Sequence, residues 1–203
     1  MIKASSTGGG FVPAPEGTHV ARCYSLVELG TQPGMKQGKW SRKIRIAWEL
    51  PEEITETEDG KMPMVVGQTY TISLNEKATL RRDLESWRGR AFTTEELKGF
   101  DLCALLGKPC MLTIVHVDKD GNKRAKINSV SKLPKSVTCP PQVHPNQEYT
   151  VDQGPGGCFH QLPEWIQTII SECKEWNSAG QQTNTPETEA PPTAPGPEDD
   201  VPF

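Results

Sequence analysis

The spacing of the apolar residues limits the possible folds of this chain more than any other feature. Runs with the period of a strand are interrupted by one run with the period of a helix. From Lys43 to Leu50, apolar and polar side chains alternate, with Ile44, Ile46 and Trp48 on one face. Alternation with period two indicates a strand that buries one face. Similar runs bounded by turn residues predict further strands at Thr18–Leu29, Gln68–Leu74, Pro109–Val117 and Lys123–Val130. The acidic stretch between residues 52 and 64 contains Asp-Gly and is expected to be an exposed hairpin loop.

The period becomes helical between the third and fourth expected strands. Leu80, Leu84 and Trp87 follow one another at intervals of four and three residues, which places them on one face of a helix over 78–88. Thr93-x-x-Glu96 is a capping box that predicts a short helical turn after it. Five strands with a helix between the third and fourth are the element order of the OB-fold, a Greek-key barrel. We therefore expect a mainly β protein with a five-stranded OB-fold Greek-key barrel over residues 15–135.

The flanking segments are expected to be less regular. Residues 1–14 are predicted to be a flexible arm, and residues 136–161 a Pro/Gly-rich irregular segment. Residues 162–177 read as an additional amphipathic helix whose apolar face packs on the barrel or serves self-association or a partner. Residues 178–203 are rich in Pro, Thr and Glu and lack a large apolar cluster, so we expect a disordered acidic tail.

Charge is distributed unevenly along the chain. Residues 1–135 carry 21 Lys and Arg against 16 Asp and Glu, whereas residues 136–203 carry 1 against 10. The body is therefore basic although the formal net charge of the whole chain is −4. A basic body favours a polyanion as partner, and an acidic tail would compete with that polyanion for the body.

In an OB-fold, strands two and three and the loops joining strands 1–2 and 4–5 contact the ligand. The basic residues within 36–45 and 119–126 fall at those places, and the helical region adds four arginines. Single-strand binding needs such cations for phosphates and aromatic rings for bases. The candidate DNA-binding residues are Lys36, Lys39, Trp40, Arg42, Lys43, Arg45, Arg81, Arg82, Arg88, Arg90, Lys119, Lys123, Arg124 and Lys126. Trp40 is the first candidate for base stacking, with a buried loop anchor as the alternative. Trp48 and Tyr70 are weaker stacking candidates, because their positions on apolar faces favour the core.

The last six residues are Glu198, Asp199, Asp200, Val201, Pro202 and Phe203. A carboxylate run followed by an aliphatic residue, Pro and Phe resembles the acidic tip of bacterial single-stranded-DNA-binding proteins, and the whole chain is similar to phage-encoded members of that class. In the resembled family the tip is captured by replication and repair proteins. The residues suit that role, because Phe203 offers an aromatic anchor and the carboxylates would steer the tip to a basic patch.

The resemblance implies a non-catalytic protein that binds single-stranded DNA without sequence preference during phage DNA replication, recombination and repair. It implies replication or recombination proteins as partners through the tip, homo-oligomers as an option, and the host cytoplasm as location. Two alternatives stay open: a strand-annealing recombination factor, and an OB-fold adaptor that binds only protein. We expect no cofactor and no membrane segment.

The sequence gives little support for a metal site, for disulfides or for an enzyme active site. Cys139, His144, Cys158 and His160 could in principle form a zinc site, but their spacing fits no standard finger. The six cysteines include no C-x-x-C pair and are expected to be free thiols. The run from Gly34 to Lys39 is one residue too short for a phosphate loop, and we find no other nucleotide-binding or hydrolase motif.

Overall fold

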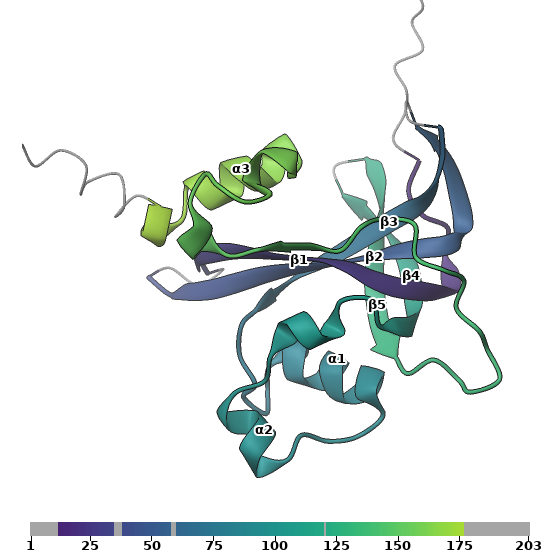
Figure 1. Ribbon diagram of the computed structural model, residues 1–203, viewed down its shortest axis with the longest axis horizontal. Helices are drawn as coiled ribbons and strands as arrows, with labels where there is room; N and C mark the ends of the chain where they lie inside the picture. Colours follow the sequence, from purple (N-terminus) through teal and green to yellow (C-terminus); the bar gives the residue numbers. More distant parts are fainter. Residues whose placement is uncertain (1–11, 35–37, 58–59, 120, 177–203) are drawn as a thin grey trace, which may run out of the picture.

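The protein is a curled antiparallel sheet with helices on two sides. The computed structural model describes residues 12–34, 38–57, 60–119 and 121–176, and the order of its main strands across the sheet is β3-β2-β1-β4-β5. Figure 1 shows α3 on one side of the sheet and α1 with α2 on the other. The elements are β1 (Gly17–Pro33), β2 (Trp40–Thr57), β3 (Gly60–Thr71), α1 (Thr79–Arg88), α2 (Thr94–Lys98), η1 (Leu102–Leu105), β4 (Pro109–Lys119), β5 (Asn122–Ser131), β6 (Gln147–Tyr149), η2 (Val151–Gln153), η3 (Phe159–Gln161) and α3 (Glu164–Ser171).

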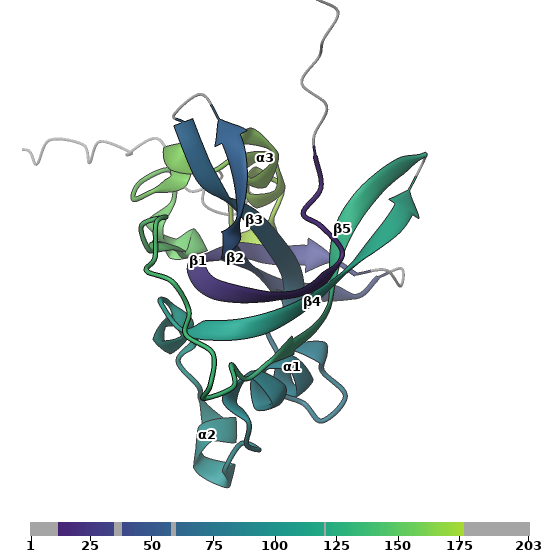
Figure 2. The same ribbon diagram turned by 90° about the vertical axis from the view of Figure 1, so that its right-hand side faces the viewer.

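The long strand β1 curls the sheet into a half-barrel. Its first part, Gly17–Arg22, pairs with β4, and its second part, Arg22–Pro33, pairs with β2. Bulges in the β1–β2 register lie between Cys23 and Ser25 and between Glu28 and Gly30, and bulges bend a strand and increase its twist. In Figure 2 the β2–β3 and β4–β5 hairpins rise on either side of the segment that leads into β1.

Strands and helices begin close to where the sequence predicts them, with one clear exception. The stretch 52–64 is not a hairpin loop. Instead β2 continues past Pro51 to Thr57 and β3 begins at Gly60, with a register shift between Leu50 and Ile54. The register shift leaves Pro51 outside the regular β2–β3 pairing, where its lack of a backbone N–H costs no hydrogen bond between the strands.

The main core fills the concave side of the sheet and is closed by α1. Trp48 and Leu112 come from strands, and Leu84 and Trp87 come from the apolar face of α1. The rings of Trp48 and Trp87 lie 5.8 Å apart between centroids, in a tilted arrangement that aromatic pairs favour. The predicted face of α1 is thus the buried one, and Gly89 ends the helix in the left-handed conformation.

A second core lies on the opposite side of β1 and holds α3 in place. Val27 and Leu29 of β1 pack with Phe159, Ile166 and Ile170. The short strand β6 pairs in parallel with Ser25–Val27, so the segment predicted to be irregular adds a strand to the sheet. The apolar face of the C-terminal helix therefore packs on the sheet, and α3 spans Glu164–Ser171, shorter than the predicted helix.

The flanking segments fall partly outside the description. Of the predicted arm 1–14, residues 1–11 lie outside the described residues, whereas Ala14 is buried in the main core. The predicted tail 178–203, with the tip Glu198–Phe203, also lies outside them. In the described part of the chain, no helix combines the length and apolar character needed to cross a membrane.

Candidate nucleic-acid interface

Arg45 lies on the outer face of the β2–β3 pair, opposite Thr69 of β3. Its guanidinium carbon lies 4.7 Å from the centroid of the Trp165 ring, which belongs to the first turn of α3. On its other side is Gly67 of β3, where a β-carbon would stand only 2.7 Å from Arg45 Nη2. The guanidinium is therefore held between the Gly67 backbone and an indole ring, an arrangement that exploits its planar shape.

Within the part of the chain that the structure describes, no acidic side chain neutralises Arg45. Burial lowers the pKa of Arg45, although an arginine stays protonated at any physiological pH. Among the described residues, no carboxylate forms an ion pair with Arg45 and no acceptor takes a hydrogen bond from it. A partly desolvated guanidinium with free N–H groups is well suited to bind a phosphate, because charge-assisted bonds to it are strong.

Trp165 presents an aromatic surface beside this cation. Its side chain is 50% exposed although its helix neighbours Ile166 and Ile170 are buried. Arg45 lies over the ring, and the exposed part of the indole is open to solvent. The pair combines a stacking surface and a phosphate-binding group, the two elements that single-strand binding requires.

A second aromatic–cation pair lies where β2 begins. Trp40 is 47% exposed, and Lys174, which follows α3, places its Nζ 4.2 Å from the centroid of the Trp40 ring. Lys39 beside it is exposed, and Lys43 Nζ donates to the Pro33 carbonyl at 3.0 Å. We call the strip formed by Trp40, Lys43, Arg45, Thr69 and Trp165 the outer strip.

Two of the predicted residues near the outer strip contribute differently. Arg42 pairs with Glu28, a buried carboxylate, and the hydrogen bond raises the pKa of Arg42. The charge of Arg42 therefore neutralises the carboxylate of Glu28. Lys36 lies outside the described residues.

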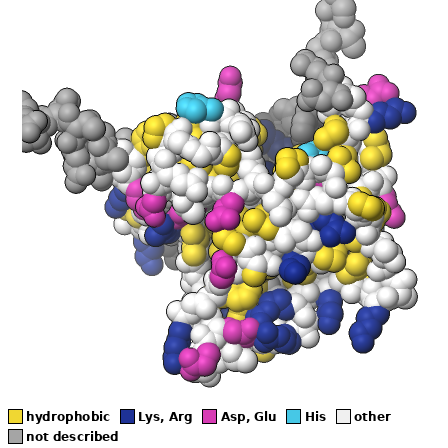
Figure 3. Space-filling model, in the orientation of Figure 1, with side chains coloured by type: hydrophobic (Ala, Val, Ile, Leu, Met, Phe, Trp, Pro, Cys, Tyr) yellow, Lys and Arg dark blue, Asp and Glu magenta, His cyan; other side chains and the backbone are white. Residues whose placement is uncertain are grey.

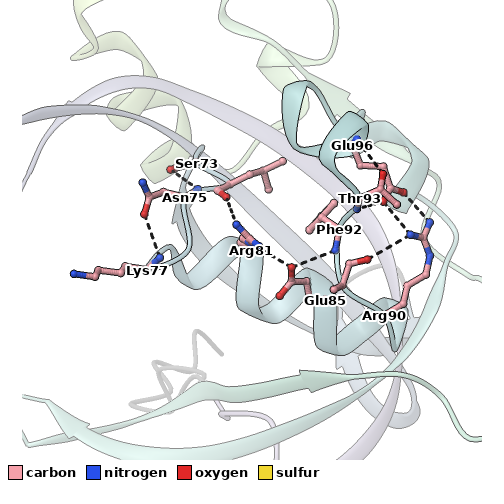
Figure 4. A network of polar contacts seen from close by, with 11 residues as sticks. Ser73, Asn75, Lys77, Arg81, Glu85, Arg90, Phe92, Thr93 and Glu96 are labelled. Atoms are coloured by element: carbon pink, nitrogen blue, oxygen red, sulfur yellow. Dashed lines mark hydrogen bonds and ion pairs between the residues drawn. The ribbon is translucent and has the colours of Figure 1, made fainter.

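The four predicted arginines of the helical region are part of structural ion pairs. Arg81 Nε lies 3.0 Å from Glu85, Arg82 Nε lies 3.2 Å from Asp83, and both Arg88 and Arg90 pair with Glu96. Figure 4 shows Arg81 and Arg90 pointing toward these carboxylates, which also accept from the backbone of Phe92 and Thr93.

The two pairs with Glu96 connect the end of α1 to α2, and all four arginines belong to this helical region, on the side of the sheet opposite α3 (Figure 1). The structure therefore does not bring the four arginines to the outer strip. Arg88 is the clearest case, because its side chain is only 14% exposed and its guanidinium lies over Phe92 and Phe100.

The β4–β5 hairpin supplies cations at a separate place. Lys123, Arg124 and Lys126 are exposed on β5 and form no ion pair among the described residues, while the side chain of Lys119 lies outside the description. They remain candidates for contacts with a longer strand.

Trp48 and Tyr70 cannot stack with a ligand in this structure. They are only 1% and 4% exposed because their alternating positions face the main core. The Tyr70 hydroxyl donates to Asp83 Oδ2 at 3.1 Å, and burial together with this carboxylate raises the pKa of Tyr70. Both residues stabilise the sheet on which the outer strip is built.

The four residues considered for zinc are not gathered. His144 Nδ1 lies 2.9 Å from the buried Glu49, Cys158 Sγ donates to the Glu148 carbonyl at 3.2 Å, and the His160 ring packs against Phe159. Cys139 lies near Arg22, while burial raises its pKa. Within the described ranges, no group of three or more His, Cys, Asp or Glu side chains is arranged to hold a metal ion.

Sequence reasoning missed Trp165 and Lys174. It assigned Trp165 to the apolar face of the helix over 162–177 without a role in DNA binding, whereas in the structure the indole is half exposed and lies beside Arg45 of β2. Comparison with known proteins found no matching family model and no matching curated relative. The assignment of a function therefore depends on the geometry of the outer strip.

Proposed function

We propose that this protein binds single-stranded DNA without sequence preference, along the outer strip. The observation that carries the proposal is the stack of Gly67, Arg45 and Trp165, in which an unpaired guanidinium lies beside a half-exposed indole. A base would stack on Trp165 and its phosphate would contact Arg45. Neither contact reads a base edge, so the binding would tolerate any sequence.

We also infer that the curled sheet is an OB-type barrel. The strand order β3-β2-β1-β4-β5, the sharing of β1 between β2 and β4, and the helix α1 between β3 and β4 support this inference. In such barrels the outer face of strands two and three binds the ligand. The outer strip lies on that face, flanked on one side by α3.

In this proposal the protein coats single strands in the cytoplasm during replication, recombination or repair. The acidic segment Glu198–Phe203 would be offered to partner proteins, because it combines carboxylates with an aromatic anchor. An assay with complementary oligonucleotides would detect a strand-annealing factor. The DNA-binding experiment below would identify an adaptor that binds only protein.

The test is the affinity for fluorescein-labelled oligo(dT), measured by anisotropy with the full chain. Loss of a stacked base costs about 1–3 kcal/mol, so Trp165→Ala should weaken binding roughly 5- to 150-fold, and Trp165→Phe should weaken it less. Trp176→Phe is the matched control, because Trp176 stacks on Phe159 within the second core. Equal affinities for the wild type and Trp165→Ala would overturn the proposal.

A further inference from the structure

A cavity of about 500 Å³ lies at the end of α1, away from the outer strip. It is open to solvent and is lined by the C-terminal turn of α1, the η1 turn, the start of β4 and the chain that leaves β5. Figure 3 shows Lys and Arg side chains gathered over this lower part of the molecule, around α1. We call it the α1 cavity.

The floor of the α1 cavity is apolar and fixed. Trp87, Phe100, Leu105 and Pro109 contribute to its lining. The Trp87 indole donates from Nε1 to the Pro109 carbonyl at 2.9 Å, which locks the ring in place. A preformed apolar pocket of this kind binds an aromatic or aliphatic side chain with little loss of its own entropy.

The rim of the α1 cavity is basic. Lys108, Lys132 and Lys135 are exposed, and no carboxylate of the described residues pairs with them. The stem of Lys132 lies over Gly89, where a β-carbon would stand 2.8 Å from Lys132 Cδ. Arg88, whose charge is paired with Glu96, also contributes to the lining, and its Nη1 is buried without a hydrogen-bond partner among the described residues. An apolar floor with a cationic rim complements an anionic ligand that carries a large apolar group.

We propose that the α1 cavity binds this chain's own acidic segment, Glu198–Phe203. Three carboxylates precede Val201, Pro202 and Phe203, so this segment offers the complementary charge and the apolar group together. Residues 1–11, the other terminal segment outside the description, contain Phe11 but no carboxylate side chain. Charge complementarity therefore selects the acidic segment as the occupant.

The connecting chain is long enough to allow this docking. At about 3.3 Å per residue, the segment 177–203 can span roughly 90 Å when extended, and roughly 30 Å as a flexible coil. The extended span suffices to pass from the end of the second core around a domain of this size, whose radius of gyration is about 15 Å. Docking would conceal Phe203 from other proteins without covering α3, which carries Trp165 beside Arg45 and lies on the opposite side of the sheet from α1 (Figure 1).

The experiment uses the full chain with p-benzoyl-L-phenylalanine in place of Phe203, followed by irradiation and mass spectrometry. We expect crosslinks to fall within residues 100–109 and 132–137. Lys132→Ala combined with Lys135→Ala should lower their yield at least fivefold. The matched control, Lys123→Ala with Lys126→Ala, removes two exposed lysines from β5 and should leave the yield unchanged.

Competition distinguishes the occupants. The free peptide EDDVPF should suppress the crosslink at a concentration at which EDDVPA does not, and a yield that rises with protein concentration would show docking between two copies. Crosslinks concentrated at the outer strip, or a yield insensitive to the lysine substitutions, would overturn the proposal. Suppression by oligo(dT) but not by EDDVPF would assign the cavity to nucleic acid and would also overturn it.

Discussion

Gly67 determines how Arg45 lies on the surface of the sheet. A glycine weakens a strand interior unless another group approaches its backbone closely, and here that group is the Arg45 guanidinium. The φ angle of Gly67 does not require glycine, since it is not among the positive-φ residues of the described chain. The glycine at this position therefore provides space for the Arg45 guanidinium beside Trp165, and the backbone conformation does not require it.

The first prediction concerns Gly67→Ala. The methyl group would meet the end of a flexible side chain, so Arg45 should move off Trp165 while the sheet stays intact. We expect the thermal midpoint to stay within a few degrees and the affinity for oligo(dT) to fall several-fold, because the guanidinium loses its fixed position. Gly99→Ala is the matched control, since no atom lies within 4 Å of a β-carbon there. An unchanged affinity in Gly67→Ala would show that the stack does not serve binding.

The second prediction concerns the charge of Arg45. Each phosphate contact to a single strand contributes about −0.7 to the slope of log K against log salt concentration. Arg45→Ala should therefore make this slope shallower by about 0.7. Arg45→Lys should retain the slope but lower the affinity, because a lysine ammonium is not planar and does not stack on the indole ring as a guanidinium does. Arg82→Ala, which changes a paired arginine of α1, should leave the slope as it is.

At this scale the sequence predicted residue types better than residue positions. Arg45 follows from the alternation of β2, which places it outward opposite the buried Ile46 and Trp48. Trp165 does not, because its place on the apolar stripe beside Ile166 suggests burial, whereas in the structure Ile166 is buried and Trp165 is half exposed. The ion pairs of Arg81 and Arg90 also depend on how α1 meets α2, which no local pattern specifies.

At the scale of elements, α3 is the part of the fold on which the outer strip depends. It carries Trp165 and is held by a small core of its own with β1. Ile170→Ala would leave a cavity under the helix at a fully buried position and should cost about 2–5 kcal/mol of unfolding free energy. It should also weaken oligo(dT) binding, since Trp165 would lose its support. Thermal unfolding and anisotropy check both effects, and Thr168→Ala on the exposed face is the control.

Glu175 attaches the chain after α3 to the end of β1 and makes this contact sensitive to acid. Burial opposes its charge, but hydrogen bonds from Thr31 Oγ1 and Thr31 N, at 2.5 and 2.8 Å, lower the pKa of Glu175 to about 2. Because the ordinary value is 4.5, the contact stabilises the folded state above that pH and loses its effect as the pH falls toward 2.

The stability difference between the wild type and Glu175→Gln should therefore be largest above pH 4.5 and shrink toward pH 2. Thermal unfolding followed by tryptophan emission measures it, because Trp176 stacks on Phe159 beside this contact. A difference that stays constant across this range would contradict the assigned role of Glu175.

The order and type of the elements followed from periodicity, but their lengths did not. The alternation of Ile44, Ile46, Trp48 and Leu50 predicted β2, yet the strand runs on through an acidic stretch that has no apolar alternation. The continuation is stabilised by pairing with β3, a contact between residues that composition alone assigns to a loop. The strand β6 escaped prediction for the same reason, since three residues paired to β1 carry no local signal.

At the scale of the whole molecule, the two proposed functions lie on two sides of one sheet. The outer strip with α3 would bind DNA, and the α1 cavity would hold the acidic segment that other proteins recognise. The uneven charge of the sequence indicated a basic body and an acidic C-terminal part. It could not indicate that five of the thirteen basic residues expected to contact DNA pair with carboxylates, because ion pairing is a property of the folded surface.

The most direct test of DNA binding is a titration of the full chain with oligo(dT), following tryptophan emission at low and at high salt beside a duplex of equal length. The account predicts quenching that saturates with the single strand, weakens as salt rises, is absent with the duplex and is reduced in Trp165→Ala. No change in emission at low salt, together with no shift in the anisotropy of the labelled oligonucleotide, would contradict it.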